Sequence, residues 1–246
     1  MAQNQADDTR AADLQPVPED WTVGLAVVAH PDDMEYGAAS AVARWTAQGK
    51  DIRYVLVTDG EAGIATMPPD QAGPLRREEQ IASCAVVGVD QVDFLGLPDG
   101  LLAEGLDLRR ALSASIRKHR PEVLLSINHR DQWGPSSWNH VDHRVVGRAL
   151  MDAARDAGNP WVFPEDGDAW NGVRFAAFSG SPAATHAVDV TQHIEAGVES
   201  LRCHRVYLEN LGGDMADAGA FLRSNAADTG PRLGVELAAG FELVWL

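Results

Sequence analysis

Two short segments of the chain contain side chains that suit a metal ion. His30, Asp32 and Asp33 follow the apolar run 23–28, which is typical of a buried parallel strand. The Ala-rich run 36–45 that comes next is typical of a helix, so these three side chains occupy a strand-to-helix turn. In open α/β sheets, ligands bind just outside the carboxyl ends of the strands. This position favours a functional role for the turn.

The second segment is His140-Val141-Asp142-His143, at the start of a predicted helix over 140–157. His140 and His143 are three positions apart and therefore project from one face of that helix. Asp142 points elsewhere, so it is better placed to orient an imidazole than to bind an ion itself. An imidazole and a carboxylate from one segment and an imidazole from the other suit a catalytic Zn²⁺, which takes three protein ligands and keeps one position open.

These residues also have ordinary structural interpretations. A carboxylate pair in a turn is often a solvated cap, and histidines at a helix start are often only surface groups. On the residues alone, the metal site and the cap both remain open. Three of the eight histidines fall in these two strand-end segments, which favours the metal site.

Composition restricts the class of protein. A chain of 246 residues is long enough for one generous α/β domain. We expect residues 1–20, which are polar and acidic, to form a flexible N-terminal arm and residues 21–246 to form a single domain. The net charge of −16 argues against a nucleic-acid partner. No apolar stretch suits a membrane span or a signal peptide, and Cys84 and Cys203 suit reduced thiols, so we expect a cytoplasmic protein with no membrane partner.

The pattern of elements predicts an α/β fold. Strands are predicted at 23–28, 52–58, 91–95, 123–127, 174–178, 185–190 and 241–246. Helices are predicted at 36–45, 75–86, 106–119, 140–157, 191–207 and 216–223. Because strands and helices alternate through the first 150 residues, we expect a Rossmann-like, doubly wound, mostly parallel sheet with helices on both faces.

The order and spacing of several short motifs resemble one known family. The motifs are Ala29-His30-Pro31-Asp32-Asp33, Thr58-Asp59-Gly60-Glu61-Ala62-Gly63, Arg76 to Glu79 ahead of Gly88-Val89, Phe94-Leu95-Gly96-Leu97-Pro98-Asp99-Gly100 and His140-Val141-Asp142-His143-Arg144. From about residue 23 to its end, the chain resembles the PIG-L/LmbE-type zinc-dependent N-deacetylases. That resemblance implies an LmbE-like deacetylase domain that removes acetyl groups from N-acetylglucosamine-type conjugates.

The resemblance also implies a role for each matching residue. The implied zinc ligands are His30, Asp33 and His143. The implied general base is Asp32, and His140 would stabilise the oxyanion or assist proton transfer, with Asp142 behind it. The implied substrate contacts are Arg76 and Asp99.

The sequence departs from the family pattern at two positions. Met34 stands directly after the two aspartates, where the family often has Glu, and Glu35 follows it, which puts the structural role of that Glu in doubt. Trp138 stands where some members have a Tyr that helps to stabilise the oxyanion, and an indole can donate a hydrogen bond but cannot act as an acid. The assisting role therefore falls more heavily on His140.

Other aromatic and imidazole groups have weaker assignments. Trp133 and Trp138 lie in the polar loop 128–139, and Trp161 and Trp170 in a second irregular segment. All four suit either packing or a platform for a sugar ring or an apolar group. We predict substrate contact for Trp133 and Trp138, because their loop leads directly to His140. The side chains expected to be hydrogen-bonded structural histidines are His129, His186, His193 and His204.

The sequence therefore predicts a hydrolase that cleaves an acetamide on an N-acetylglucosamine-type conjugate, with one Zn²⁺ per chain. Carboxylate-imidazole sites also admit Fe²⁺ or Co²⁺. Two alternatives remain: an amidase that cuts a larger acyl or thiol-conjugate amide at the same zinc, and a metal-free α/β module that binds a sugar or nucleotide. The expected partner is a small N-acetylated sugar conjugate, and a homo-oligomer is compatible with the sequence.

Overall fold

Eight strands form one sheet at the centre of the protein. The computed structural model describes residues 14–246. The strands follow the spatial order β1 (Gln15–Pro16), β9 (His186–Asp189), β10 (Ala238–Trp245), β8 (Phe175–Ser179), β5 (Val123–Ile127), β2 (Val23–Val28), β3 (Asp51–Leu56) and β4 (Gln91–Phe94). The five from β8 to β4 run parallel, whereas β10 is antiparallel to both of its neighbours. The mostly parallel sheet is therefore as predicted.

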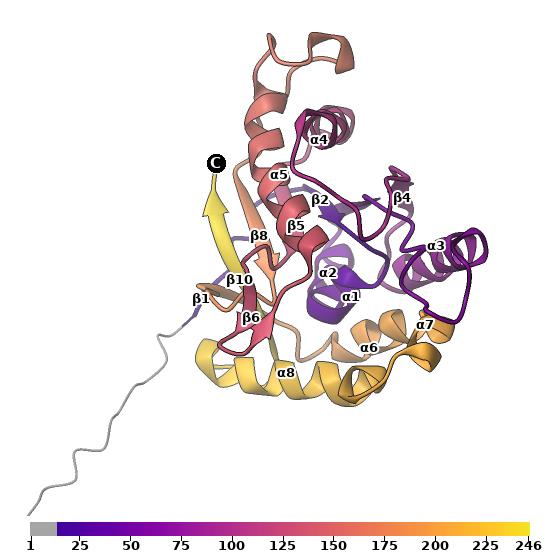
Figure 1. Cartoon of the computed structure of the whole chain (residues 1–246). Helices are drawn as coiled ribbons and strands as arrows, with labels where there is room; N and C mark the ends of the chain where they lie inside the picture. The colour runs from indigo at the N-terminus through magenta and orange to yellow at the C-terminus, as the bar shows by residue number, and fades with distance from the viewer. Residues whose placement is uncertain (1–13) are drawn as a thin grey trace, which may run out of the picture.

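Helices cover both faces of this sheet. The helices α4 (Leu106–His119) and α5 (Val141–Gly158) pack on one face. The other face is covered by α2 (Ala39–Ala47), α3 (Pro69–Val86), α6 (Ile194–Arg202) and α8 (Ala218–Leu233) (Figure 1). Side chains of β2 alternate between the two faces of the sheet. Ala26 and Val28 pack in the core on the side of α2, α3, α6 and α8, and Leu25 and Val27 pack in the core on the side of α4 and α5. Burial on both faces explains the continuous apolar run of β2.

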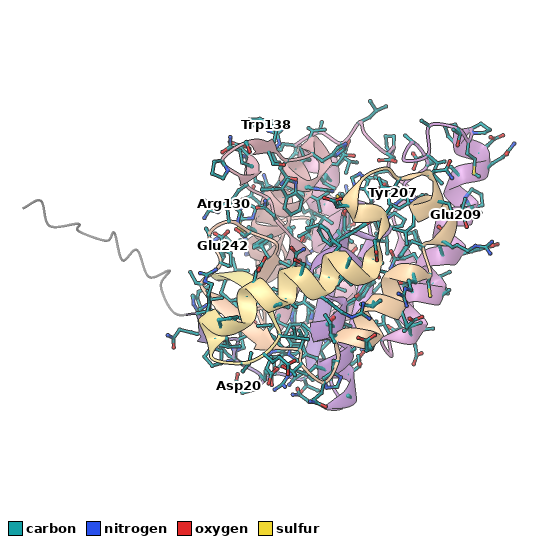
Figure 2. All side chains as sticks on the ribbon, turned by 90° about the horizontal axis from the view of Figure 1, so that it is seen from below. Asp20, Arg130, Trp138, Tyr207, Glu209 and Glu242 are labelled. Atoms are coloured by element: carbon teal, nitrogen blue, oxygen red, sulfur yellow. The ribbon has the colours of Figure 1, made fainter. Side chains whose placement is uncertain are left out.

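Several element boundaries differ from the sequence-based expectation. Helix α3 begins at Pro69 rather than near residue 75, because a proline in the first turn has no N–H to leave unpaired. The predicted helix 191–207 is two helices, α6 and α7 (Arg205–Asn210), with Cys203 and His204 between them. Helix α8 continues to Leu233, well past the predicted end at 223, and Figure 2 shows it crossing the front of the molecule. Short elements that the patterns did not reveal are α1 (Asp33–Gly37), β6 (Gln132–Gly134), β7 (Ser137–Trp138), η1 (Pro164–Asp166) and η2 (Asp214–Ala216).

The expectation of a flexible arm over residues 1–20 is wrong for its second part. Residues 1–13 lie outside the described residues. Beyond them, Gln15 and Pro16 pair with His186 and Ala187 of β9, and Val17 donates its backbone N–H to the Ala187 carbonyl. Leu14 and Val17 are each only 5% exposed, so apolar burial holds this segment against the sheet. Within residues 14–246, none of the helices combines the length and apolar character needed to cross a membrane.

Candidate metal centre and active site

The carboxyl ends of neighbouring parallel strands bring the candidate residues together. The turn after β2 carries His30, Asp32 and Asp33, the loop after β4 carries Asp99, and the connection from β5 leads into α5 with its two histidines. Strand β2 lies between β5 and β3, and β4 lies on the far side of β3. Parallel strands present their carboxyl ends at one edge, so residues far apart in sequence meet there.

The backbone at Asp32 is in an unusual conformation. Its φ of 85° and ψ of −19° are left-handed, a region that non-glycine residues adopt at an energetic cost. The turn is held from α3: the Asp32 N–H donates to Gln80 Oε1 (3.0 Å), and Arg76 Nη2 donates to the Pro31 carbonyl (2.6 Å). The sharp turn directs the Asp32 and Asp33 side chains into the cavity, which both of them line.

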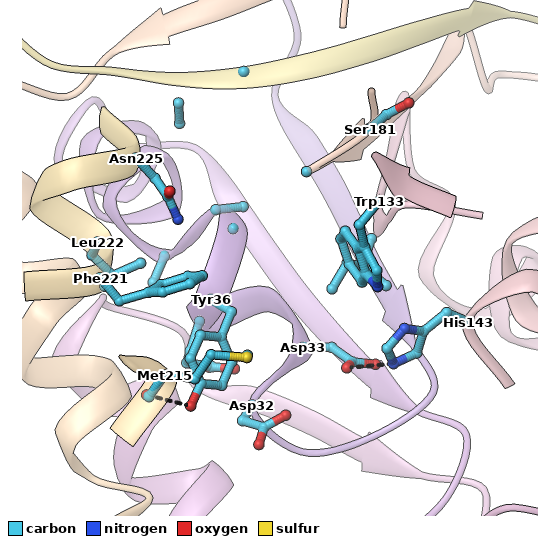
Figure 3. A pocket seen from close by; sticks show the side chains of 18 of the residues that line it. Asp32, Asp33, Tyr36, Trp133, His143, Ser181, Met215, Phe221, Leu222 and Asn225 are labelled. Carbon is cyan, nitrogen blue, oxygen red and sulfur yellow. Dashed lines mark hydrogen bonds and ion pairs between the residues drawn. The ribbon is translucent and has the colours of Figure 1, made fainter. Parts of the chain in front are cut away.

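Three predicted ligands, His30, Asp33 and His143, converge on one point. His30 Nδ1 lies 3.2 Å from His143 Nε2. His143 Nε2 lies 3.0 Å from Asp33 Oδ1, and His30 Nδ1 lies 3.6 Å from Asp33 Oδ2. Figure 3 shows Asp33 and His143 pointing toward each other across the bottom of the cavity. The structure therefore brings together the two sequence segments from which this set was predicted.

The hydrogen bonds of the two imidazoles fix which nitrogen carries the proton in the neutral ring. Asn139 Nδ2 donates to two backbone carbonyls, those of Asn128 (2.7 Å) and Arg130 (2.9 Å), so its Oδ1 is the atom that accepts from His143 Nδ1 (2.9 Å). His143 Nε2 is then left with a lone pair. In His30, Nε2 donates outward to Asp99 (3.0 Å), which leaves the lone pair on Nδ1.

The two facing lone pairs make this donor set suitable for a cation. Without a cation or proton between them, two imidazole nitrogens 3.2 Å apart with lone pairs facing each other would repel. The adjacent Asp33 carboxylate adds a negative oxygen at the same point. Two imidazoles and one carboxylate are the ligand set of many catalytic zinc sites.

Electrostatics at this point also favour positive charge. Burial alone would lower the pKa of His30, but the carboxylates of Asp33, Asp142 and Asp99 raise it well above its ordinary value. Burial would raise the pKa of Asp33, but the imidazoles of His143 and His30 lower it far below its usual range. A buried cluster of carboxylates therefore surrounds His30. A bound cation would neutralise the negative charge of these carboxylates.

His140 and Asp142 occupy positions that differ from the expected arrangement. His140, His30 and His143 also lie within ligand distance of one another, as do His30, Asp99 and Asp142. However, His140 Nδ1 accepts the Asp142 backbone N–H (3.2 Å) and caps α5. The prediction that Asp142 stands behind His140 is wrong for its carboxylate, which accepts from His30 Nε2 (3.3 Å) and from the Gly100 N–H (2.7 Å). The reason is the turn of the helix, which directs successive side chains to different faces.

The neutral form of His140 is a hydrogen-bond donor toward the cavity. Burial and the rings of His30 and His143 lower its pKa below the ordinary value. Because its Nδ1 already accepts a backbone N–H, the proton of the neutral ring resides on Nε2. His140 lines the cavity, where this N–H is available to an oxygen atom of a ligand.

Arg76 lies beside Asp32 at the wall of the cavity and is itself buried. Its side chain is 2% exposed, and its Nη2 donates to Asp32 Oδ2 (3.0 Å) as well as to Pro31. Its Nη1 donates to the Gly60 carbonyl (3.1 Å). These hydrogen bonds give Arg76 a role in positioning Asp32. Arg76 also lines the cavity, so the implied substrate contact stays a prediction.

Asp32 combines deep burial with one cationic neighbour. Burial raises its pKa to about 7, although the guanidinium of Arg76 opposes the shift. A carboxylate with a pKa near neutrality is suited to accept and release a proton. Two tyrosines that sequence reasoning missed flank it: Tyr207 stacks on the Arg76 guanidinium at 4.1 Å, and the Tyr36 hydroxyl donates to the Met215 carbonyl (3.0 Å). They come from α7 and α1, where no motif marked them.

Asp99 supports the site through two contacts. Its Oδ1 lies 3.0 Å from His30 Nε2, and its Oδ2 accepts the Ala62 N–H (2.9 Å). Asp99 also lines the cavity, so the predicted substrate contact stays a prediction. Its orientation of His30 is a role that the sequence did not suggest.

The doubt about Glu35 is resolved by its contacts. Glu35 is 1% exposed, and its Oε1 accepts from Gln80 Nε2 (2.8 Å) and Ser83 Oγ (2.9 Å). Burial raises its pKa to about 7. Met34, which displaces the Glu by one position, is fully buried in the core. Glu35 therefore links the turn to α3, although Met34 precedes it.

The structural histidines do not all have the expected hydrogen bonds. His186 Nδ1 lies 2.8 Å from Thr185 Oγ1, as expected. His204 is fully buried, and within residues 14–246 neither of its ring nitrogens has a hydrogen-bond partner, nor does His129 Nδ1. Burial lowers the pKa of His204 to about 3. The expectation of a hydrogen-bonded imidazole is therefore wrong for His204.

The candidate site opens into a large cavity. Its volume is about 920 Å³, and its lining includes the predicted ligands as well as Trp133 and Trp138. The Trp133 ring meets the His143 ring edge-on at 5.9 Å, and Trp138 is 64% exposed with Arg144 at 5.0 Å. Trp161 and Trp170 are absent from the lining formed by residues 14–246. Trp170 instead donates its Nε1–H to the Pro121 carbonyl (2.7 Å), a packing role.

The fold and this site define an α/β protein with a candidate His/Asp metal centre at the carboxyl edge of its sheet. Comparison with known proteins identifies the group more narrowly. The family model described as PIG-L: GlcNAc-PI de-N-acetylase matches residues 25–154, which is more than half of the chain. The chain belongs to this PIG-L family of metal-dependent deacetylases, hydrolases that act on amide bonds.

Individual relatives agree with this assignment. The diacetylchitobiose deacetylase of Thermococcus kodakarensis is 29% identical, over 73% of this chain and 68% of that protein. A 1D-myo-inositol 2-acetamido-2-deoxy-alpha-D-glucopyranoside deacetylase from Streptomyces avermitilis is 31% identical, over 59% of this chain and 57% of that protein. The structure of N,N'-diacetylchitobiose deacetylase from Pyrococcus horikoshii superposes with a TM-score of 0.82 and 24% identity, over 92% of this chain and 85% of that one. This last likeness establishes the fold.

Proposed function

We propose that this protein removes the acetyl group from an N-acetylglucosamine-type sugar conjugate, with Zn²⁺ held by His30, Asp33 and His143. The observation that carries the proposal is the convergence of two imidazole nitrogens, His30 Nδ1 and His143 Nε2, 3.2 Å apart beside the Asp33 carboxylate. The relatives named above supply the substrate class, because both curated names describe deacetylation of an acetamido sugar.

The ion would contribute Lewis acidity toward an acetamide carbonyl and a water molecule. The remaining chemistry belongs to the protein. Asp32 lies next to a proposed ligand, but its carboxylate is hydrogen-bonded to Arg76 and is not assigned to the metal. It is therefore available to accept a proton. We assign it the proton of the attacking water, which it returns to the amine nitrogen as the C–N bond breaks. Its pKa, raised by burial to about 7, suits both directions of transfer.

His140 would stabilise the oxygen of the reacting carbonyl. Its Nε2–H is directed to the cavity because Nδ1 is committed to the Asp142 backbone N–H. Such donors act where negative charge develops in the transition state. The rigid cap of α5 holds the ring in place, so little reorganisation is needed. Trp138 adds only an exposed indole and no acid.

The choice among divalent ions rests on the donor set. Two imidazoles and a carboxylate suit Zn²⁺, and Fe²⁺ or Co²⁺ are alternatives that the same atoms admit. Analysis of the metal in protein isolated without added ions would name the native one. The cytoplasmic location and the homo-oligomer stay predictions from the sequence.

Two rival functions make different predictions. An amidase for larger acyl groups would use the same donor atoms, but would prefer amides with longer acids. A metal-free binding module would bind a sugar without consuming it. The geometry of the donor set argues against the module, because it directs two imidazole nitrogens and a carboxylate at one point.

The test is a mass-spectrometric screen of N-acetylated sugar conjugates incubated with the zinc-loaded protein. We expect at least one conjugate to lose the mass of an acetyl group replaced by hydrogen, with one equivalent of acetate released. His143→Ala protein serves as the matched control, since it should neither hold the ion tightly nor release acetate. Binding of a conjugate without any mass change would overturn the proposal.

A further inference from the structure

Asn139 is a buried amide beside the metal centre that the proposed chemistry does not use. Its side chain is 1% exposed, and it joins the loop 128–139 to α5, directly ahead of His140. A buried amide needs partners at both ends, because its oxygen only accepts hydrogen bonds and its nitrogen only donates them. The partners of Asn139 therefore show what this side chain holds in place.

The orientation of the Asn139 amide is set by backbone groups. Its nitrogen, Nδ2, lies 2.7 Å from the Asn128 carbonyl oxygen and 2.9 Å from that of Arg130, and both of these oxygens can only accept. On the opposite side, the His140 backbone N–H, which can only donate, points at Oδ1 (2.8 Å). A flipped amide would lose all three hydrogen bonds, so these groups identify the oxygen end of the side chain.

The oxygen end of Asn139 contacts a proposed metal ligand. Oδ1 lies 2.9 Å from His143 Nδ1, and because this oxygen can only accept, Nδ1 must carry the proton. The metal-binding atom of the ring is then Nε2, which lies 3.2 Å from His30 Nδ1 and 3.0 Å from Asp33 Oδ1. The amide therefore fixes both the rotation of the His143 ring and the nitrogen that the ring offers to a cation.

The nitrogen end of Asn139 holds the loop that borders the cavity. Both carbonyls that accept from Nδ2 belong to residues 128–131, which lead into β6. The Asn139 backbone N–H closes the same loop by donating to the Asp131 carbonyl (2.8 Å). Beyond this point the loop carries Trp133, whose ring meets the His143 ring edge-on at 5.9 Å. One amide therefore fixes a metal ligand relative to a wall of the cavity.

We infer that Asn139 is a positioning residue for the metal, which raises metal affinity by holding His143 with Nε2 directed at the ion. Asn139 acts through His143 and touches neither the ion nor the substrate. Removal of a group that orients a metal-binding histidine typically lowers metal affinity by about 10–100-fold. The inference rests on the metal centre of the proposed function but not on its substrate, so it is tested by zinc binding with no substrate present.

The first experiment measures the zinc affinity of metal-stripped protein by competition with a chromophoric chelator. Asn139→Ala removes the acceptor and should bind zinc about 10–100-fold more weakly. Asn139→Asp keeps an oxygen for His143 Nδ1 but loses both hydrogen bonds that Nδ2 donates, and it should restore most of the affinity. Wild-type affinity in Asn139→Ala, or an equal loss in the two variants, would overturn the inference.

Asn128→Ala is the matched control for a general effect on the loop. Asn128 is equally buried, and its amide also pairs with the loop backbone: Nδ2 donates to the Gln132 carbonyl (2.9 Å), and Oδ1 accepts the Arg130 N–H (3.0 Å). Like Asn139→Ala, this change leaves buried partners unpaired and should lower the melting temperature. Its zinc affinity should stay at the wild-type value. An equal loss of affinity in Asn128→Ala would assign Asn139 to the packing of the loop.

The second experiment needs no variant of Asn139. In zinc-loaded wild-type protein with isotope-labelled histidine nitrogens, the NMR signals that His143→Gln protein lacks should show a protonated Nδ1 and a metal-bound Nε2. The Nδ1 proton should exchange slowly with water, because it is bonded to a buried oxygen. A protonated Nε2, or a rapidly exchanging Nδ1 proton, would overturn the inference even where Asn139→Ala fails to fold.

The outcomes for this inference and for the proposed function are distinguishable. Tight zinc binding that depends on Asn139, without acetate release from any conjugate, would contradict the proposed function and support the positioning role. Acetate release with a zinc affinity that Asn139→Ala leaves unchanged would do the reverse. Wild-type protein that binds no zinc would contradict both.

Discussion

Asp32 is the residue at which backbone strain, burial and a cationic partner coincide. It holds a left-handed φ of 85°, is 5% exposed and bonds to Arg76. Strained conformations persist only where the surroundings enforce them, and they gather at functional sites. Gln80 and Arg76 enforce this one from α3. The motif predicted the residue, but not the strain or its supports.

Asp32→Asn should keep the metal and lose the rate. The amide retains the shape of the side chain but cannot take a proton, so kcat should fall by about 10²–10⁴-fold. Acetate release and metal content are measured on the same sample. Asp59→Asn is the control, because this carboxylate lies in a nearby loop and pairs with Arg77 at 3.2 Å. Loss of zinc from the Asp32 variant would show that Asp32 is itself a ligand.

Arg76→Lys distinguishes positioning from substrate binding. A lysine keeps the charge but cannot hold Asp32, Pro31 and Gly60 at once, as the planar guanidinium does. We expect kcat to fall by roughly 10–100-fold, as when groups that orient active-site ligands are removed. KM should change little, because Arg76 is buried beside Asp32. A large rise in KM with an intact kcat would instead support the substrate contact that the family resemblance implies for Arg76.

At the scale of elements, the order of strands and helices could be predicted, and their ends only in part. Continuous apolar runs such as Val23–Val28 and Val123–Ile127 identify strands buried on both faces, and both strands have the predicted bounds. The break between α6 and α7 was missed, because helical periodicity continues through Cys203 and His204. Only tertiary contacts, such as the Glu79 side chain accepting the Val206 N–H, end one helix and begin the other.

The candidate site was predictable to a similar extent. Ligand types and spacing pointed to the two segments, and the family resemblance implied His30, Asp33 and His143, which the structure brings together. The partners of these ligands were not predictable, because they depend on which way a side chain leaves its helix or loop. The side chain of Asp142 points to His30, and that of Arg76 points to Asp32. No local sequence pattern indicates the direction of either side chain.

The β6–β7 hairpin tests whether its indoles serve the substrate. Trp133 lines the cavity beside His143, and we predict that Trp133→Ala raises KM for the natural conjugate by roughly 5–150-fold. Activity on a minimal N-acetyl sugar should hardly change, because we assign the indole to the non-reacting part of the conjugate. Equal losses on both substrates, or a lower melting temperature with normal kinetics, would assign Trp133 to packing.

The junction between α6 and α7 carries a buried imidazole whose titration affects stability. Burial lowers the pKa of His204 from 6.5 to about 3, and Arg76 adds to the shift. Glu35, whose Oε2 lies 3.8 Å from His204 Nε2, is the facing carboxylate. Between about pH 3 and pH 6.5, His204 is protonated in the unfolded chain but neutral in the folded protein. The stability that the neutral imidazole provides is therefore fully present above pH 6.5 and is lost as pH falls through this range.

His204→Gln should remove this dependence. Relative to the variant, the wild-type free energy of unfolding should rise with pH across that window, with a slope of up to about 1.4 kcal/mol per pH unit. Urea unfolding at several pH values measures it. The raised pKa of Glu35 acts in the opposite direction in both proteins and therefore drops out of the difference. Ser200→Ala, a change in the same buried region that does not titrate, should keep the wild-type slope. A pH-independent difference between His204→Gln and wild type would refute the buried neutral imidazole.

The whole molecule supplies what no single element has. Strands β2, β4 and β5 each contribute one part of the site through their carboxyl ends, and α3 supports the turn from outside the sheet. Helix α8 then covers the cavity that leads away from the metal centre. The formal net charge of −16 disfavours recognition through a basic surface, which leaves the buried donor set as the feature that defines the ligand.

The most direct test of the account is a zinc titration of metal-stripped protein, with acetate release from an N-acetylglucosaminide as the readout. The account predicts negligible release without metal, a linear rise with added zinc and a plateau at one equivalent per chain. His143→Ala and Asp33→Ala should show no such stoichiometric plateau. Full acetate release by the stripped wild-type protein, or an unchanged titration in either variant, would contradict the central claim that these side chains hold the ion required for deacetylation.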